Sequence, residues 1–203
     1  MKINRVLIFY PDEFNVQAKF NRKLLKILQG MSQIELQFIR DEQKLIHDFS
    51  TNECTNTSLK QLKDFQESDC SHAIFFDDGE VFVEELKILK SKEIPTRLIK
   101  VSITRVVNIQ RQKEFADKTS SSTYEYIGRG SYWGNPYSMH EQGEDREEVI
   151  RKYEYDFKFD KFPNKEIKRV HELTGKRLGC FCKPYPCHGD VLADYLNSYD
   201  DGS

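Results

Sequence analysis

Apolar positions in the first hundred residues alternate between two spacings. Residues 5–10 (RVLIFY) form a continuous apolar run, typical of a β-strand, and in residues 20–31 the apolar positions recur every three or four residues, as in a helix with one buried face. The same alternation predicts strands at 34–40, 72–76 and 96–101 and helices at 58–66 and 81–93. Because this order is typical of parallel βαβ units, residues 1–101 are predicted to form a three-layer, Rossmann-like α/β domain.

After Pro95 the pattern changes, and the second half mixes short strands with helices. Asp145 followed by Glu148 three residues later resembles a capping box, so a helix is expected to begin there and to run to about Phe157. Strands are expected at 101–109, 124–128 and 176–182, and helices at 164–173 and 191–197. Residues 102–203 are therefore predicted to form a smaller α+β domain.

The composition restricts the class of protein. With 38% hydrophobic and 12% aromatic residues, a chain of 203 residues can bury a core, which excludes disorder. The 31 Lys and Arg side chains against 33 Asp and Glu give a net charge of -2, which disfavours nucleic acid as a partner. No apolar run approaches the roughly 18 residues of a membrane span, so we expect a cytoplasmic protein without a membrane partner.

Three of the five cysteines lie close together in the sequence C-x-C-x4-C-H. Residues two apart in a strand point to the same face, so Cys180 and Cys182 should present both sulfurs to one pocket. Cys187 and His188 fall at the start of the last helix, where free N–H groups favour a thiolate.

Two chemistries and one structural role fit this cysteine pattern. In the first, Zn²⁺ is held by Cys180, Cys182, Cys187 and either His188 or His171. In the second, Cys187 is a catalytic nucleophile and His188 is its base. In the third, the cysteines pack a buried corner and His188 caps the helix.

Residues 126–137 (YIGRGSYWGNPY) combine aromatic, polar and glycine residues in a way that suits a planar ligand. Trp133 or Tyr132 can stack on a base, Asn135 can bind its edge, and Arg129 can bind a phosphate or carboxylate. Alternatively, Trp133 anchors the core and the Gly-Asn-Pro sequence forms a tight turn.

Arg105 and Asn108 lie three residues apart on a predicted strand, so their side chains should point to opposite faces. At most one of them should therefore reach a ligand at this site. We expect that residue to be Arg105.

The sequences TRVVNI, YIGRGSYWGNPY, DREEVIRKYEYDF and GKRLGCFCKPYPCHGDVLADYLN follow one another between residues 104 and 197. In this order they resemble a phage and bacterial domain family of unknown function, designated four-three-two-six. The resemblance implies an origin in a phage or a bacterium, and it adds Arg146 to the candidate ligand-binding residues. These are then Arg105, Arg129, Trp133, Asn135 and Arg146.

The first half, through SHAIFFDDG and EELKILKSKEIPTRLIKV, is similar to the SLOG superfamily of Rossmann-like nucleotide-ligand binders. That family usually places a glycine-containing loop after its first strand, whereas this chain has residues 10–14 (YPDEF). Asp12, Glu13, Asp77 and Asp78 would gather at the carboxyl ends of the strands and repel a bare phosphate. This crevice is expected to bind a nucleoside or sugar, to hold a divalent cation, or to serve only as a scaffold.

Two functions follow from these patterns and resemblances. The first is binding or processing of a nucleotide-derived small molecule, with hydrolysis or transfer at a glycosidic or phosphate bond, as in nucleotide salvage, base modification or handling of a defence signal. The alternative is a non-enzymatic, zinc-stabilised phage accessory or regulatory module that binds a host protein or nucleic acid. Both place the protein in the cytoplasm of a bacterial or phage-infected cell.

Overall fold

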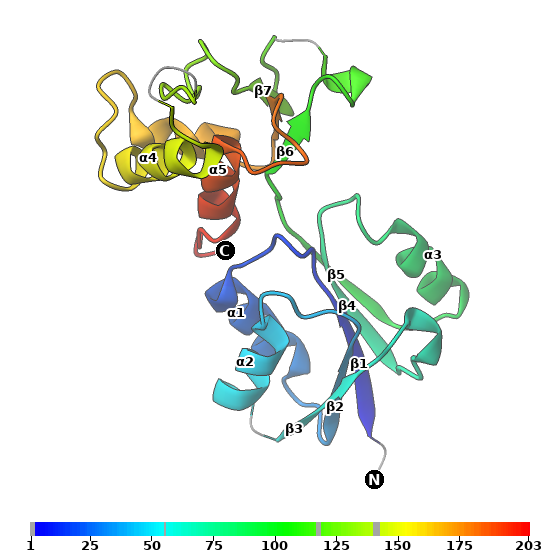
Figure 1. The fold of residues 1–203 in the computed structure, drawn as a ribbon. Helices are drawn as coiled ribbons and strands as arrows, with labels where there is room; N and C mark the ends of the chain where they lie inside the picture. The colour runs from blue at the N-terminus through cyan, green and yellow to red at the C-terminus, as the bar shows by residue number, and fades with distance from the viewer. Residues whose placement is uncertain (1–2, 55, 117–118, 140–142) are drawn as a thin grey trace. The chain divides into compact units, whose positions relative to one another are not determined.

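The chain forms two compact units in a computed structural model that describes residues 3–54, 56–116, 119–139 and 143–203 (Figure 1). The first unit contains residues 1–101 together with 198–203, and the second contains residues 102–197. The last six residues thus fold with the first half of the chain, although they follow the second unit in sequence.

The first unit is built on a parallel sheet of five strands. These are β1 (Asn4–Phe9), β2 (Ile34–Phe38), β3 (Thr57–Gln61), β4 (His72–Asp77) and β5 (Thr96–Lys100). Their order across the sheet is β3-β2-β1-β4-β5, and every neighbouring pair is parallel. This confirms the predicted Rossmann-like α/β fold, in which the strand order reverses between β1 and β4.

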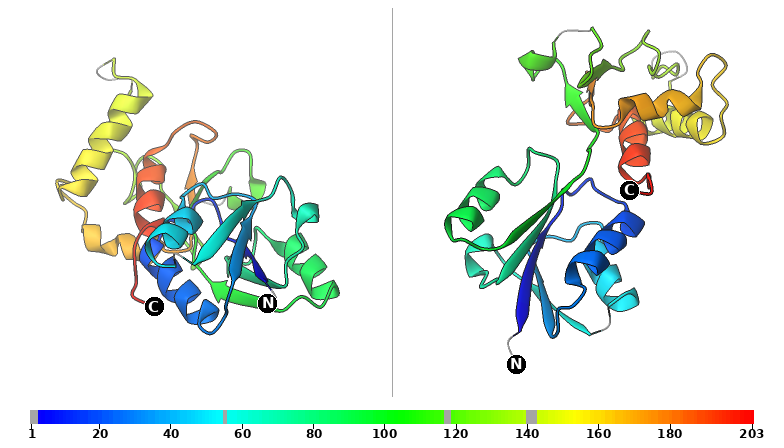
Figure 2. Two further views of the ribbon diagram at one scale, coloured as in Figure 1. Left: turned by 90° about the horizontal axis from the view of Figure 1, so that it is seen from below. Right: turned by 180° about the vertical axis from the view of Figure 1, so that it is seen from behind.

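Helices cover both faces of this sheet. Figure 1 shows α1 (Gln17–Leu28) and α2 (Leu45–Asn52) on one face and α3 (Val83–Ser91) on the other. A single 3-10 turn, Phe65–Glu67, precedes β4. Figure 2 shows the same layers from below and from behind.

Successive side chains of the central strands point to opposite faces of the sheet, so the same strands contribute to the hydrophobic core on each face. Phe9 of β1 stacks on Phe75 of β4 with 4.5 Å between ring centroids, and both contact Phe82 at the start of α3. On the opposite face, Phe20 of α1 stacks on Phe76 of β4 at 4.8 Å. Because helices cover both faces of the sheet, the sequence of β1 is continuously apolar and does not alternate between apolar and polar residues.

The helix expected at 58–66 was a wrong prediction. Residues 57–61 form strand β3, which pairs with β2 from Thr57 opposite Ile34 to Gln61 opposite Phe38. The preceding helix is α2, at residues 45–52. β3 is an edge strand whose side chains are mostly exposed. Its polar residues therefore resemble those of the exposed face of a helix.

The second unit has a parallel sheet of its own, in the order β6-β8-β7. Its strands are β6 (Arg105–Asn108), β7 (Tyr124–Tyr126) and β8 (Arg177–Cys180). The helices α4 (Arg146–Lys158) and α5 (His188–Asn197) accompany the sheet, with 3-10 segments at Lys113–Phe115 and Ile167–Leu173. The segment expected to be a helix at 164–173 is thus a 3-10 helix at Ile167–Leu173, and the strand expected at 101–109 is the shorter β6.

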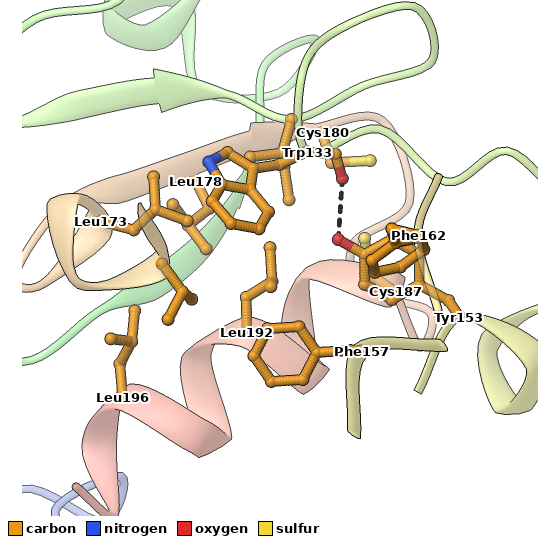
Figure 3. Packing of buried hydrophobic residues seen from close by; sticks show 12 residues of the cluster. Trp133, Tyr153, Phe157, Phe162, Leu173, Leu178, Cys180, Cys187, Leu192 and Leu196 are labelled. Carbon is orange, nitrogen blue, oxygen red and sulfur yellow. Dashed lines mark hydrogen bonds between the residues drawn. The ribbon is translucent and has the colours of Figure 1, made fainter. Parts of the chain in front are cut away.

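Asp145 caps α4 as its sequence predicted, because its carboxylate accepts a hydrogen bond from the Glu148 backbone N–H at 2.8 Å. The core of this unit gathers Trp133, Tyr153 and α5 residues such as Leu192 (Figure 3). The Tyr153 hydroxyl donates to the Trp133 carbonyl at 2.9 Å. None of the helices in the described part of the chain is long and apolar enough to cross a membrane.

Candidate functional site

Three cysteine sulfurs converge where β8 turns into α5. The Sγ atoms of Cys180 and Cys182 are 3.6 Å apart, and those of Cys180, Cys182 and Cys187 all lie within 4.8 Å of one another. Cys180 and Cys187 are buried, whereas Cys182 is half-buried. These three residues are called the thiol cluster below.

Asn108 fixes the turn that carries the thiol cluster. Its amide nitrogen donates to the carbonyls of Phe181 at 3.0 Å and Lys183 at 2.6 Å. Its amide oxygen accepts from the backbone N–H groups of Gln110 and Arg111 at 2.9 and 3.2 Å. The buried Asn108 side chain therefore satisfies four backbone groups at once.

Asn108 and not Arg105 reaches the turn that carries the thiol cluster, while the ligand-binding role of Arg105 stays a prediction. Asn108 is the last residue of β6 and lies opposite Cys180 in the sheet register, whereas Arg105 is the first residue and lies opposite Arg177. Parallel strands bring their carboxyl ends together, so only Asn108 can reach the turn. Neither Arg105 nor Asn108 lines the cavity described below.

Replacing Asn108 with alanine is expected to lower the free energy of unfolding by about 1–3 kcal/mol, because buried backbone groups lose their partners. Urea denaturation of the variant measures this change. Gln110→Ala is the matched control, since the Gln110 side chain is exposed and only its backbone bonds to Asn108. A stability loss of equal size in both variants would contradict the role given to Asn108.

His188, and not His171, lies next to the thiol cluster. The His188 Nε2 atom is 2.9 Å from the Ile127 carbonyl, so this nitrogen carries the proton, and the Nδ1 lone pair faces the Cys187 sulfur at 3.6 Å. Burial lowers the pKa of His188, which keeps the ring neutral. His171 is exposed on the 3-10 segment, where its ring lies 5.9 Å from that of Tyr195.

A cavity of about 180 Å³ opens beside the thiol cluster. All three cysteines and His188 line it, together with two predicted ligand-binding residues that carry positive charge, Arg129 and Arg146. The remaining lining residues are mostly apolar or aromatic: Gly128, Asn135, Tyr137, Met139, Val149, Ile150, Phe181 and Pro186. Residues from the segment 128–139, from α4 and from the turn that carries the thiol cluster thus form one site.

Trp133 packs in the core, and Asn135 holds a turn. Trp133 is only 3% exposed, lies in the core and does not line the cavity, so its ring is not presented to a ligand (Figure 3). The Asn135 amide donates to the Val149 carbonyl at 3.1 Å and accepts from the Tyr137 N–H at 2.9 Å. Asn135 borders the cavity, but its side chain is already used to hold the turn.

Arg146 links the cavity to the cysteine turn. It donates to the Pro186 carbonyl at 3.3 Å, and its guanidinium lies 5.4 Å from the centre of the Tyr185 ring. Hydrogen bonds from Cys180, then from Cys187 and Arg146, lower the pKa of the Cys182 thiol. The neighbouring Cys180 and Cys182 thiols, together with burial, raise the pKa of Cys187.

Phe181 and Tyr185 are the aromatic residues at this site that sequence reasoning did not identify. Phe181 lines the cavity and is 42% exposed, and Tyr185 is 63% exposed. Their signal in the sequence is the presence of two large aromatic side chains in a turn that also holds three cysteines and two prolines.

The thiol cluster fits a metal ion. In a tetrahedral zinc site with Zn–S bonds near 2.3 Å, two sulfurs lie about 3.8 Å apart, close to the 3.6 Å between Cys180 and Cys182. Among the residues that the structure describes, this is the only group of three or more His, Cys, Asp or Glu side chains close enough to share a metal ion. The contact between His188 and this group is the one between its Nδ1 atom and the Cys187 sulfur.

The acidic residues at the strand ends of the first unit organise its loops. Asp77 accepts from the Gly79 N–H at 3.0 Å, and Asp78 accepts from the Glu80 N–H at the same distance. Asp12 forms an ion pair with Arg40 at 3.1 Å. The three roles expected for the crevice stay predictions.

The fold and the site define a two-unit α/β protein, in which a Rossmann-like unit is joined to a unit with a three-cysteine cluster. Residues 3–107 match the family model of the minimal SLOG domain, so the chain belongs to that family. Residues 107–198 match the model of the domain of unknown function DUF4326. Both resemblances drawn from the sequence are confirmed.

A protein of Enterobacteria phage T4, described as an uncharacterized 12.4 kDa protein in the nrdA-td intergenic region, is similar to this chain. The two are 37% identical over 97 residues, which cover 47% of this chain and 87% of the phage protein. No solved structure is significantly similar to the chain.

Proposed function

We propose that the second unit binds a nucleotide-derived small molecule in the cavity beside the thiol cluster and promotes hydrolysis or transfer at its glycosidic or phosphate bond. The observation that carries this proposal is the presence of Arg129, Arg146 and all three clustered cysteines on the wall of one cavity. Apolar walls with a few convergent polar groups are typical of small-molecule sites. The resemblance of the first unit to nucleotide-ligand binders supports the same class of ligand.

The two arginines suit the anionic end of such a ligand. A guanidinium group donates two parallel hydrogen bonds to a phosphate or carboxylate. Arg129 is exposed and uses one donor on the Tyr137 carbonyl at 3.4 Å, and Arg146 uses one on Pro186, so both retain donors for a ligand. Phe181 offers the ring face for a planar base that we had expected from Trp133.

The cavity is small beside the roughly 300–1,000 Å³ that encloses a drug-sized ligand. It therefore suits a ligand that inserts one end and leaves the other in solvent. Because the cysteines lie on the cavity wall, the inserted end would be the part that reacts.

The thiol cluster is proposed to hold Zn²⁺ through Cys180, Cys182 and Cys187. A zinc ion bound by three protein ligands polarises an oxygen of a ligand or lowers the pKa of a bound water. The chain's own residues prepare this site: Asp190 accepts from the Cys187 backbone N–H at 2.9 Å, and Gly189 N–H donates to the Cys187 sulfur at 3.4 Å. Both contacts hold the Cys187 sulfur toward its two partners.

A nucleophilic Cys187 with His188 as its base is less well supported. The Cys187 side chain is 1% exposed, so its sulfur has little access to a substrate bond. Ligation of a metal needs three convergent sulfurs, which the structure contains, whereas a nucleophile needs access to the reacting bond.

Native mass spectrometry and thermal shift across a panel of nucleotides and nucleosides test the proposal. We expect at least one compound to bind, and Arg146→Ala to weaken its binding about tenfold or more, as expected when a charged hydrogen bond is lost. Arg151→Ala is the matched control, since Arg151 lies on the same helix, is exposed and pairs with Glu148.

The absence of any bound compound and of any thermal shift would contradict the proposed ligand class. If the same protein retained one zinc ion per chain, the result would support the alternative of a zinc-stabilised, non-enzymatic module. Equal loss of binding in Arg146→Ala and Arg151→Ala would show that the ligand binds outside this cavity.

A further inference from the structure

Helix α1 of the first unit carries only positive charge. Lys19, Arg22, Lys23 and Lys26 lie within its twelve residues, which contain no Asp or Glu. Residues 19, 23 and 26 are spaced four and three apart, so these lysines lie along one face of the helix. One side of the unit therefore has a row of cations, although the chain as a whole has a net charge of -2.

This row borders a groove of about 550 Å³ between α1 and strand β5. Its lining consists of cationic and aliphatic side chains together with one serine: Lys19, Lys23, Lys26, Ile27, Arg97, Leu98, Ile99, Lys100 and Ser203. All belong to the first unit, and we call this surface the α1–β5 groove. Figure 2 shows α1 beside β5 when the molecule is seen from below.

An acidic segment of the chain already contacts one end of this surface. Asp200 forms two hydrogen bonds with the Arg22 guanidinium at 2.7 and 2.8 Å, and Asp201 forms an ion pair with Lys19 at 3.0 Å. The Ser203 carbonyl accepts a further bond from Arg22 at 3.0 Å. Acidic side chains of the chain itself thus already bind cationic side chains of α1 beside the groove.

Most of the groove's charge is not neutralised by this segment. Within the described part of the chain, four cations of the groove form no ion pair: Lys23, Lys26, Arg97 and Lys100. Uncompensated cations at close range attract anions and disfavour other partners. The groove therefore retains the capacity to bind a second anionic group beyond Asp200 and Asp201.

The lining favours a peptide over a nucleic acid. The groove has no aromatic side chain on which a base could stack, and stacking supplies much of the affinity for single strands. It does have aliphatic residues, including Leu98, which is 43% exposed. Strand β5 is also the edge of the sheet, where a partner strand can pair with free backbone groups.

We propose that the α1–β5 groove binds an extended acidic segment of a partner protein, and that residues 200–203 compete with that segment for α1. The partner segment would place its carboxylates on the lysines of α1 and on Arg97, and its apolar side chains on Ile27 and Leu98. This surface is independent of the cavity in the second unit.

The test measures fluorescence anisotropy of a fluorescein-labelled octapeptide of alternating aspartate and leucine with the full chain. A peptide with asparagine in place of aspartate is the charge control. We expect the triple variant Lys23→Glu, Lys26→Glu, Arg97→Glu to weaken aspartate-peptide binding about tenfold or more, since each exposed ion pair contributes modestly. The double variant Asp200→Asn, Asp201→Asn should strengthen binding about threefold, because the competing carboxylates are removed.

Lys87→Glu with Lys90→Glu on α3 is the matched control, because both lysines are exposed on the helix that covers the other face of the sheet. This variant should leave binding unchanged. Equal binding of both peptides, or equal loss in the α1–β5 and α3 variants, would overturn the proposal. A single-stranded RNA octamer that binds more tightly than the aspartate peptide, and loses binding in the triple variant, would assign the groove to nucleic acid instead.

Discussion

Cys180→Ser should abolish the zinc binding proposed for the thiol cluster and lower the melting temperature of the second unit by about 10–20 °C. Cys180 is 4% exposed and its sulfur lies 3.6 Å from that of Cys182, so a hydroxyl in its place removes one of three ligands from a buried site. Metal binding is coupled to folding, and a loss of roughly 3 kcal/mol corresponds to this shift for a unit of about 100 residues. Elemental analysis and calorimetry of protein purified without an affinity metal measure both effects.

Cys70→Ser is the matched control for this experiment. Cys70 is also buried, but it lies in the core of the first unit and outside the thiol cluster. It should lose some packing energy without any change in zinc content. Zinc content that is equal in wild type and Cys180→Ser would rule out the cluster as the metal site.

Cys187→Ser distinguishes the metal ligand from the nucleophile. As a ligand, Cys187 is required for zinc and for stability, so both should fall as they do in Cys180→Ser. As a nucleophile, it would be required for turnover, while the melting temperature and zinc content stayed near those of the wild type. A variant unchanged by all three measurements would leave only a packing role.

Trp133→Ala should lower the free energy of unfolding by about 3–5 kcal/mol, as expected when a large buried aromatic side chain is removed. Trp133 is 3% exposed, packs in the core of the second unit and contacts the Tyr132 ring at 5.1 Å. Its truncation would leave a cavity that the surrounding side chains fill only in part. Urea denaturation measures the loss.

Tyr185→Ala is the control for Trp133, because Tyr185 belongs to the same unit but is 63% exposed. Its stability should stay within about 0.5 kcal/mol of the wild type. If Trp133→Ala instead kept its stability and lost nucleotide binding, Trp133 would be a stacking residue and its packing role would be wrong.

Local patterns were sufficient for the fold class and for the cysteines of the site. The apolar run at residues 5–10 and the helical spacing that follows it predict βαβ units, because strand and helix periodicities are properties of neighbouring residues. The Asp145 cap was predictable for the same reason. The cysteine spacing identified all three members of the thiol cluster, since they lie within eight residues of one another.

Contacts between segments far apart in sequence decided the features that local patterns did not predict. Residues 57–61 form a strand because β2 supplies hydrogen-bond partners that no local pattern shows. Asn108 reaches the cysteine turn, and Arg105 does not, because the register of β6 against β8 sets which residue meets Cys180. Burial of Trp133 and pairing of residues 200–203 with α1 also join segments far apart in sequence. Periodicity encodes which face of an element is apolar, whereas the partner of that face depends on how all the elements pack together.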